Sequence, residues 1–140
     1  MTKDEIKQLI PHREPMLLVD ESYMVDDHVE SKYTIPQDAF FVQGHFPGNP
    51  IVPGVILCEI MAQGSVLLIP TELLNANLAL YSGLDDVRFK GTVRPGDTVV
   101  TTASLQALRY PLVIIDAEAR VDGKLCSKGT LKFFMIPKQH

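Results

Sequence analysis

Two side chains that exchange protons readily lie fourteen residues apart in this sequence, His45 and Glu59. His45 lies in a loop rich in proline and glycine, and its imidazole, with an ordinary pKa of about 6.5, titrates near neutral pH. Glu59 lies in an almost entirely apolar run, where burial raises the pKa of a carboxyl group. We therefore expect His45 to act as a general base and Glu59 as its protonated partner.

The apolar run around Glu59 predicts a buried helix. Pro53 favours a helix start at Gly54 or the residue after it, and the run that follows, to residue 69, is interrupted only by Glu59 and Gln63. A segment that is apolar on all sides is enclosed by protein or by lipid. A membrane span needs about 20 apolar residues, and this run is shorter and bounded by prolines, so we expect a central helix of a globular protein.

The spacing within this helix suggests chemistry beside a carbonyl group. Glu59 and Gln63 are four residues apart and therefore project from the same face. The amides of the first turn, at Gly54, have no partners within the helix and are available to a ligand oxygen. A carbonyl oxygen bound at Gly54 would be polarised by the backbone amide, and the carboxyl group of Glu59 would lie about one helical turn further along the helix.

Three stretches together resemble one enzyme family. The string HFPGNPIVPG at 45–54, with Glu59 and the Ala-Gln pair at 62–63 after it, is similar to bacterial 3-hydroxyacyl-[acyl-carrier-protein] dehydratases, and more narrowly to their FabZ group. The segments at 10–20 (IPHREPMLLVD) and 87–97 (VRFKGTVRPGD) resemble the opening and the middle of the same family. The family has a hotdog fold, so the resemblance implies that fold for most of the chain.

The resemblance also implies roles for the site residues. His45 would remove the proton next to the thioester carbonyl, and Glu59 would act on the 3-hydroxyl group. Gly54 would supply a backbone amide to the carbonyl oxygen, and Gln63 would hold Glu59 or a water molecule. The substrate-binding residues expected are Gly54, Gln63, Phe46 and Val55. His45 and Glu59 of one site would come from different subunits of a homodimer.

The implied reaction is dehydration of a 3-hydroxyacyl-[acyl-carrier-protein] to the trans-2-enoyl product, in fatty acid or related acyl-chain biosynthesis. No metal and no cofactor is expected. One alternative is a dual dehydratase and isomerase of the same fold; its best-known group has Asp where this chain has Glu59. A thioesterase of this fold and a non-catalytic acyl-carrier-binding subunit are further alternatives.

The expected partners are an acyl carrier protein with a phosphopantetheine-linked acyl chain and a second copy of the chain, as a homodimer or a trimer of dimers. The net charge of −4 combines 4 basic and 13 acidic side chains in residues 1–87 with 9 basic and 4 acidic ones in 88–140. The basic half suits an acidic carrier, with Arg88, Lys90 and Arg94 as docking residues. Nucleic-acid-binding proteins are typically basic, so this acidic chain is not expected to bind nucleic acid. The N-terminal residues are charged and do not form the apolar core of a secretory signal, so a cytoplasmic location is expected.

The remaining pattern predicts an α+β protein in one domain, 1–140, with a curved antiparallel sheet of about six strands wrapped around one long central helix. A capping box at Thr2 and Glu5 predicts a short first helix. Residues 71–77 are expected to form a polar link, and Gly83 is a candidate bulge. The expected strands are 16–25, 29–35, 78–89, 98–108, 111–121 and 125–136.

Three finer expectations concern register and cavity lining. The last hairpin is predicted to turn through a three-residue loop ending at Gly123, which would set Asp116 opposite Lys128. Tyr81 and Phe89 are candidates for an acyl tunnel, although core packing explains them equally well. His12 shows no chemical partner in the sequence and is interpreted as structural.

Overall fold

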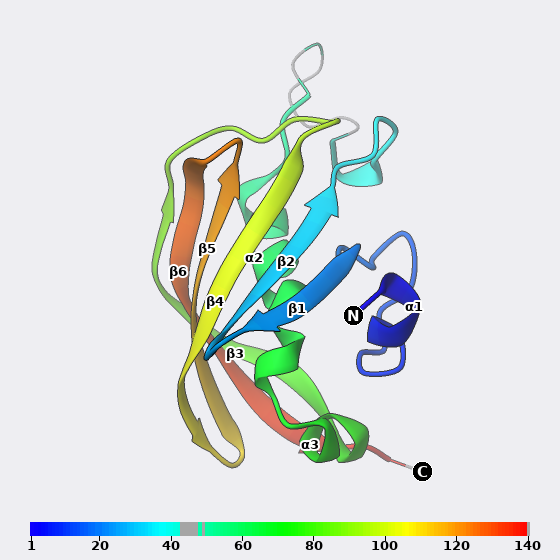
Figure 1. The fold of residues 1–140 in the computed structure, drawn as a ribbon, viewed down its shortest axis with the longest axis vertical. Coiled ribbons are helices and arrows are strands. Elements are labelled where there is room, and N and C mark those ends of the chain that lie inside the picture. The colour runs from blue at the N-terminus through cyan, green and yellow to red at the C-terminus, as the bar shows by residue number, and fades with distance from the viewer. Residues whose placement is uncertain (43–47, 49, 140) are drawn as a thin grey trace.

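Six strands form one antiparallel sheet in the order β1-β2-β4-β5-β6-β3 (Figure 1). The structure, a computed structural model, describes residues 1–42, 48 and 50–139. The strands are β1 (Glu21–Val25), β2 (His28–Thr34), β3 (Asn77–Phe89), β4 (Thr98–Arg109), β5 (Leu112–Val121) and β6 (Lys124–Pro137). The helices are α1 (Lys3–Ile6), α2 (Gly54–Gly64) and α3 (Thr71–Ala76), with 3-10 turns at Phe40–Val42 and Val66–Leu68.

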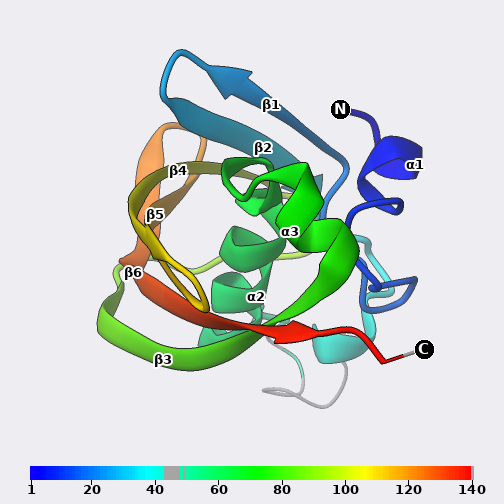
Figure 2. The same cartoon turned by 90° about the horizontal axis from the view of Figure 1, so that it is seen from below.

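Helix α2 lies in the concave face of the curved sheet, which wraps around it (Figure 2). Its side chains at Leu57, Ile60 and Met61 are at most 2% exposed and belong to the same core as Val113 and Leu131 of the sheet. A helix surrounded by a sheet must be apolar nearly all round, which explains the run in the sequence. The predicted hotdog fold, an α+β sheet around one central helix, is confirmed.

The central helix ends earlier than predicted. Its α-helical part stops at Gly64, and a 3-10 turn follows instead of regular helix to residue 69. The hydroxyl of Ser65 donates to the carbonyl of Met61 at 2.6 Å, an interaction that competes with the regular helical pattern. At Gly64 the helix approaches β2 so closely that a Cβ atom would overlap the hydroxyl of Ser31. Glycine therefore allows the close contact between helix and sheet.

The segment predicted as a polar link is the helix α3. It begins directly after Pro70, and Leu74 from it is 3% exposed. A proline sets the backbone dihedral needed at a helix start, and burial of one apolar side chain then anchors the short helix against β3. The sequence prediction was wrong because two adjacent leucines, Leu73 and Leu74, in so short a segment give no helical periodicity.

The hairpin between β5 and β6 has a different turn from the predicted one. Val121 pairs with Lys124 across a two-residue turn in which Asp122 and Gly123 both have positive φ, 50° and 79°. A register shift at Cys126 then restores the alternation of faces, so Asp116 pairs with Thr130 rather than Lys128. The predicted alignment of the apolar faces is correct, but a bulge produces it rather than a longer loop.

Other local predictions are confirmed. Thr2 and Glu5 form the expected capping box of α1, with side-chain and backbone groups bonded in both directions. A register shift lies between Tyr81 and Gly83, where a bulge was predicted. Among the described residues, no helix has the length and apolar character needed to cross a membrane.

Candidate active site

Glu59 projects from the middle of α2, and two side-chain nitrogens contact its carboxyl oxygen Oε1. Gln63 donates through Nε2 at 3.0 Å, and His12 contacts the same oxygen through Nε2 at 3.3 Å. The Glu59 side chain keeps 21% of its surface exposed. Within the described residues, Oε2 has no protein donor, so one oxygen of the carboxyl group is anchored and the other remains available.

Gln63 connects Glu59 to the N-terminal segment. Its amide oxygen accepts from the backbone N–H of Leu18 at 2.6 Å, and its Nε2 donates to the carbonyl of Met16 at 2.8 Å as well as to Glu59. The side chain is only 3% exposed, so these three bonds fix its orientation. The structure places Gln63 beside Glu59 as the four-residue spacing predicts, whereas its role toward a substrate stays a prediction.

The same bonds explain why the first strand is shorter than expected. The predicted strand covered 16–25, but β1 begins at Glu21. The backbone groups of Met16 and Leu18 bond to the side chain of Gln63 instead of to a neighbouring strand. An amide side chain offers a donor and an acceptor, as a strand edge does, and therefore replaces the strand partner here.

His12 is the site residue that sequence reasoning missed. It was interpreted as structural and without a chemical partner, but its imidazole contacts the Glu59 carboxyl group. Arg13 holds the segment that carries it, donating to the carbonyls of Ile10, His12 and Lys7 at 3.0, 2.6 and 3.0 Å. Local periodicity contains no signal for a contact across 47 residues; only the position of His12 within the family-like opening segment marked it.

The pKa of Glu59 is lowered, against the expectation of a raised one. Burial acts to raise the pKa of the carboxyl group, as predicted. The hydrogen bonds from His12 and Gln63, together with the charge on His12, lower the pKa and outweigh that effect. The prediction took account of the apolar helix but not of donors brought from another segment. In this single chain the carboxyl group is therefore ionised at neutral pH.

Glu59 lines an apolar cavity of about 270 Å³ between α2 and β3. The hydroxyl of Tyr81 donates to the carbonyl of Cys58 at 2.8 Å, and its ring stacks on Phe133 at a centroid distance of 4.9 Å. Burial, then the negative charge of Glu59, raises the pKa of the Tyr81 hydroxyl, which therefore stays neutral. The wall of this cavity consists of Leu9, Ile10, Pro11, His12, Glu59, Ala62, Gln63, Val66, Ile69, Leu74, Asn77, Leu78, Ala79, Leu80, Tyr81, Ile115 and Phe133.

Gly54 and Val55 lie at a different cavity, of about 590 Å³, at the start of α2. The ring of Phe89 packs on Gly54 so closely that a Cβ atom there would lie 2.9 Å from two ring carbons. Val55 is 73% exposed. Tyr81 and Phe89, both candidates for one tunnel, thus line separate cavities. Among the described residues, the linings of these two cavities share no side chain, so Gly54 and Glu59 lie at different cavities.

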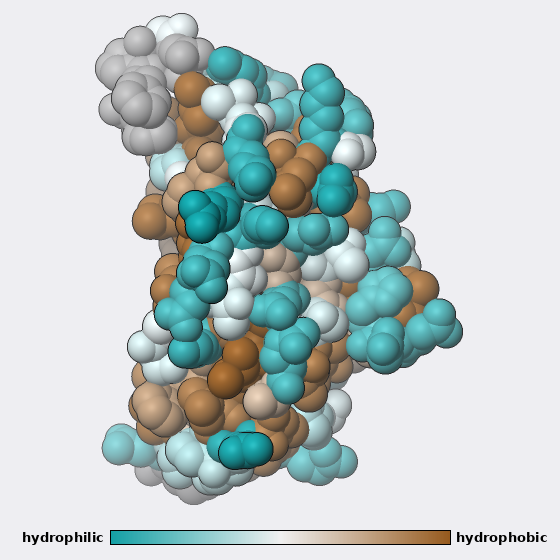
Figure 3. Space-filling view, turned by 90° about the vertical axis from the view of Figure 1, so that its left-hand side faces the viewer, coloured by the Kyte–Doolittle hydropathy of each residue, from teal (hydrophilic) through white to brown (hydrophobic). Residues whose placement is uncertain are grey.

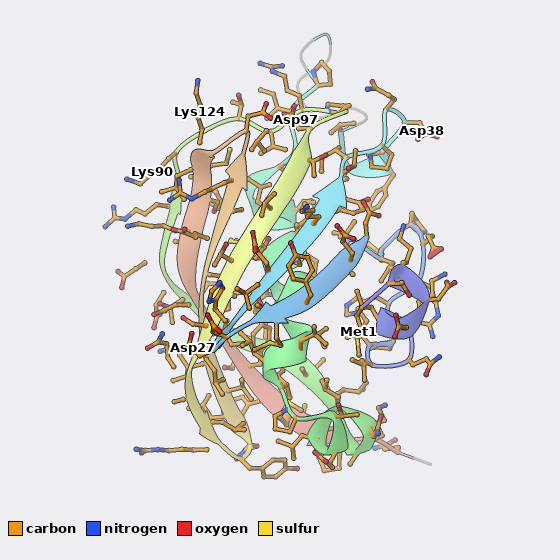
Figure 4. The ribbon with its side chains drawn as sticks, viewed as in Figure 1. Met1, Asp27, Asp38, Lys90, Asp97 and Lys124 are labelled. Atoms are coloured by element: carbon orange, nitrogen blue, oxygen red, sulfur yellow. The ribbon has the colours of Figure 1, made fainter. Side chains whose placement is uncertain are left out.

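Two predicted site residues, His45 and Phe46, lie outside the described residues. The predicted docking residues are exposed: Arg88 at the end of β3, and Lys90 and Arg94 in the segment that follows. Lys90 and Lys124 both lie toward the upper left of the view in Figure 4. The Arg94 guanidinium also donates to the carbonyl of Pro50 at 3.4 Å. No group of three or more His, Cys, Asp or Glu side chains that could hold a metal ion occurs among the residues that the structure describes.

The chain is similar to known proteins in sequence and in fold. The model of the FabA-like domain family matches residues 10–129. The chain is 43% identical over 131 residues to the 3-hydroxyacyl-[acyl-carrier-protein] dehydratase FabZ of Streptococcus pyogenes, covering 92% of this chain and 94% of that protein. The protein of the same name from Streptococcus uberis is 41% identical with the same coverage.

Solved structures share the fold at low sequence identity. The dehydratase heterocomplex ApeI:P from Xenorhabdus doucetiae has a TM-score of 0.78 at 19% identity, covering 95% of this chain and 91% of that chain. A mutant thioesterase from Pseudomonas aeruginosa has a TM-score of 0.70 at 13% identity, covering 99% and 96%. At such identities these structures show the fold alone. The family match and the FabZ relatives show more: this chain belongs to the FabA-like domain family.

Proposed function

We propose that this FabA-like chain is a hydro-lyase that converts 3-hydroxyacyl-[acyl-carrier-protein] to the trans-2-enoyl product in fatty acid or related acyl-chain biosynthesis. The observation that carries the proposal is a carboxyl group, Glu59, held by one oxygen on a buried helix at the wall of an apolar cavity. Such a cavity suits an acyl chain, and the carboxyl group suits the 3-hydroxyl. The FabZ relatives, at 41–43% identity, support the same reaction.

In the proposed reaction His45 takes a proton from the carbon next to the thioester carbonyl. The electron pair left on that carbon forms the double bond as the C3–O bond breaks. Glu59 gives its proton to the departing hydroxyl group, which leaves as water. The backbone amide of Gly54 stabilises the negative charge that develops on the carbonyl oxygen. His45 gains the proton that the substrate loses, so the step balances.

The lowered pKa of Glu59 in the single chain fits the reverse reaction directly. Hydration of an enoyl thioester needs an ionised carboxyl group that accepts a proton from water, and this is the form present at neutral pH. Dehydration needs the protonated form. We infer that substrate and a second subunit cover the cavity and remove more water, because further desolvation raises the pKa of a carboxyl group.

The proposed assembly is a homodimer with shared active sites, alone or as a trimer of dimers. The separation of Gly54 from Glu59 supports it, because a second subunit is then needed to complete a site. The exposed surface of β3 and β6 also supports it. Strand β3 is an edge strand, and hydrophobic side chains gather on this face among polar ones (Figure 3). They include Leu80, Phe134 and Ile136, which share one side of the sheet and are each at least 45% exposed.

The proposed carrier-docking residues are Arg88, Lys90 and Arg94. Their side chains are exposed and basic, and they lie next to the cavity at the start of α2. An acidic carrier protein would be attracted to such a surface, and the attraction would weaken with salt. A cytoplasmic location is part of this proposal and follows from the carrier-bound substrate.

The test is hydration of crotonyl-[acyl-carrier-protein], followed in the wild-type protein and in the variants His45→Ala and Glu59→Gln. We expect turnover by the wild type and a loss of activity in each variant. Mixing the two variants should restore activity, because a hybrid dimer regains one working centre. Full activity in either variant would contradict the assigned roles, and no recovery despite proven subunit exchange would contradict the shared site.

The alternatives make different predictions in the same experiment. A dual dehydratase and isomerase forms the cis-3-enoyl product as well, which chromatography of the released acyl chains detects. A non-catalytic carrier-binding subunit binds the acyl carrier but shows no turnover with an intact dimer. A thioesterase releases free acid from the carrier.

A further inference from the structure

The N-terminal segment places an imidazole, His12, against the carboxyl group that the proposed function uses. Nε2 of His12 lies 3.3 Å from Oε1 of Glu59, and both side chains line the same apolar cavity. His12 is the only basic side chain among the described residues of that wall. Its charge and its hydrogen bond are two of the causes that lower the pKa of Glu59. This contact lies outside the roles assigned above to His45, Glu59, Gly54 and Gln63.

The contact leaves one oxygen of Glu59 available. Gln63 and His12 both approach Oε1, one from the same helix and one from the N-terminal segment. Two donors on one oxygen fix the plane and rotamer of a carboxyl group more closely than one donor does. Oε2 has no protein donor within the described residues, and it is the oxygen left to exchange a proton with the 3-hydroxyl group.

The imidazole of His12 is positioned by the segment that carries it. Its Nδ1 is buried and has no hydrogen-bond partner among the described residues. Nε2 is therefore the ring nitrogen that contacts Glu59, at 3.3 Å from Oε1. Three hydrogen bonds from Arg13 to backbone carbonyls fix the segment that carries the ring.

We propose that His12 is a positioning residue for Glu59, which orients the carboxyl group through Oε1 and presents Oε2 to the substrate. This inference rests on the proposed function for its kinetic consequence, but its structural part, the contact that lowers the pKa of Glu59, stands independently. The other titratable groups that face Glu59 are Tyr81 of β3 and Cys58 of α2. Burial raises the pKa values of both groups, so both are neutral at the acidic pH values at which Glu59 titrates.

The test compares two substitutions at this position. His12→Gln places a neutral amide donor near the position of Nε2, whereas His12→Leu keeps the bulk and removes the donor. We expect His12→Leu to lower kcat for crotonyl-carrier hydration about 10- to 100-fold with little change in KM, as for the loss of one hydrogen bond to a charged group. His12→Gln should recover a large part of that loss. His28→Leu, at the first residue of β2, is the matched control, and its kcat should be unchanged.

A second readout does not depend on turnover. In protein with carbon-13 in its glutamate carboxyl groups, the Glu59 signal is assigned by its absence in Glu59→Gln and titrated by NMR. We expect the pKa of Glu59 to rise in His12→Leu and to rise less in His12→Gln. The limb of the pH–rate profile that reports the Glu59 pKa should also move to higher pH, further in His12→Leu than in His12→Gln.

The outcomes separate this inference from the proposed function. An unchanged kcat and an unchanged Glu59 pKa in a folded His12→Leu protein would overturn the positioning role. Equal loss of kcat in both variants without a change in that pKa would also overturn it. If the His12→Leu protein does not fold, the Glu59 pKa measured by NMR in His12→Gln tests the positioning role. An unchanged Glu59 pKa in that variant would then overturn the role. Absence of turnover in the wild type would refute the proposed function, and the NMR titration would still test the contact.

Discussion

The imidazole of His12 and the carboxyl group of Glu59 meet at 3.3 Å, although 47 residues separate them in the chain. The contact joins the N-terminal segment to the central helix at the wall of the cavity. Gln63 makes a second connection between the same two parts through Met16 and Leu18. The N-terminal segment therefore holds Glu59 both directly, through His12, and indirectly, through Gln63.

Replacing Glu59 by glutamine should remove activity and keep the fold. Glutamine has nearly the same shape and its carbonyl oxygen still accepts from His12, but it cannot exchange a proton. We expect kcat for crotonyl-carrier hydration to fall about 100-fold or more, the size of a general acid–base contribution. Steady-state kinetics give kcat, and circular dichroism serves as the control for folding. A kcat within a few-fold of wild type would contradict the proton-transfer role.

Acidification should destabilise the wild-type protein through Glu59. The pKa of this group is lower in the folded state than in the unfolded chain, so its ionised form favours folding above the unfolded-state pKa, about 4.3. That stabilisation is lost as the pH falls through the folded-state pKa. Urea unfolding at a series of pH values, at one protein concentration, should show a steeper loss for wild type than for Glu59→Gln. Parallel curves would show that Glu59 does not contribute.

Removing the amide of Gln63 should weaken both the fold and the site. In Gln63→Leu the buried backbone N–H of Leu18 and the partly buried carbonyl of Met16 lose their partner. An unsatisfied buried group costs about 1–3 kcal/mol, so we expect the loss at the Leu18 N–H to lower the free energy of unfolding by about 1–3 kcal/mol. Urea unfolding measures this.

The matched control for Gln63→Leu is Gln106→Leu. Gln106 is exposed and donates only to the hydroxyl of Ser104 at 3.3 Å. Its replacement should change the free energy of unfolding by less than about 0.5 kcal/mol. Equal effects at the two positions would mean that the bonds of Gln63 to the N-terminal segment do not stabilise the fold.

Adding a methyl group at Gly54 should disturb the start of α2. In Gly54→Ala the new Cβ atom would lie 2.9 Å from ring carbons of Phe89, which must then move. Because the Phe89 ring is 53% exposed and can shift, we expect a cost of about 1 kcal/mol, at the low end for overpacked contacts. The same substitution in a Phe89→Ala background should cost less, and a double-mutant cycle by urea unfolding measures the coupling. Additive effects would show that the ring does not restrict this position.

Sequence reasoning located the parts of this protein that depend on local pattern. The buried helix, the capping box of α1, the bulge beside Gly83 and the four-residue spacing of Glu59 and Gln63 follow from periodicity and from the backbone preferences of proline and glycine. Each involves neighbours within a few residues. The family resemblance supplied the fold and the reaction, which the family model and the FabZ relatives support.

Contacts between distant segments decided the rest. The sequence places Glu59 in apolar surroundings, which predicts a raised pKa, but the fold brings His12 and Gln63 to one carboxyl oxygen and the pKa is lowered. The bulge at Cys126 and the helix α3 likewise depend on packing against other strands. Hydrogen-bond donors from another part of the chain change the state of a group without changing its sequence neighbours, so only the tertiary structure determines that state.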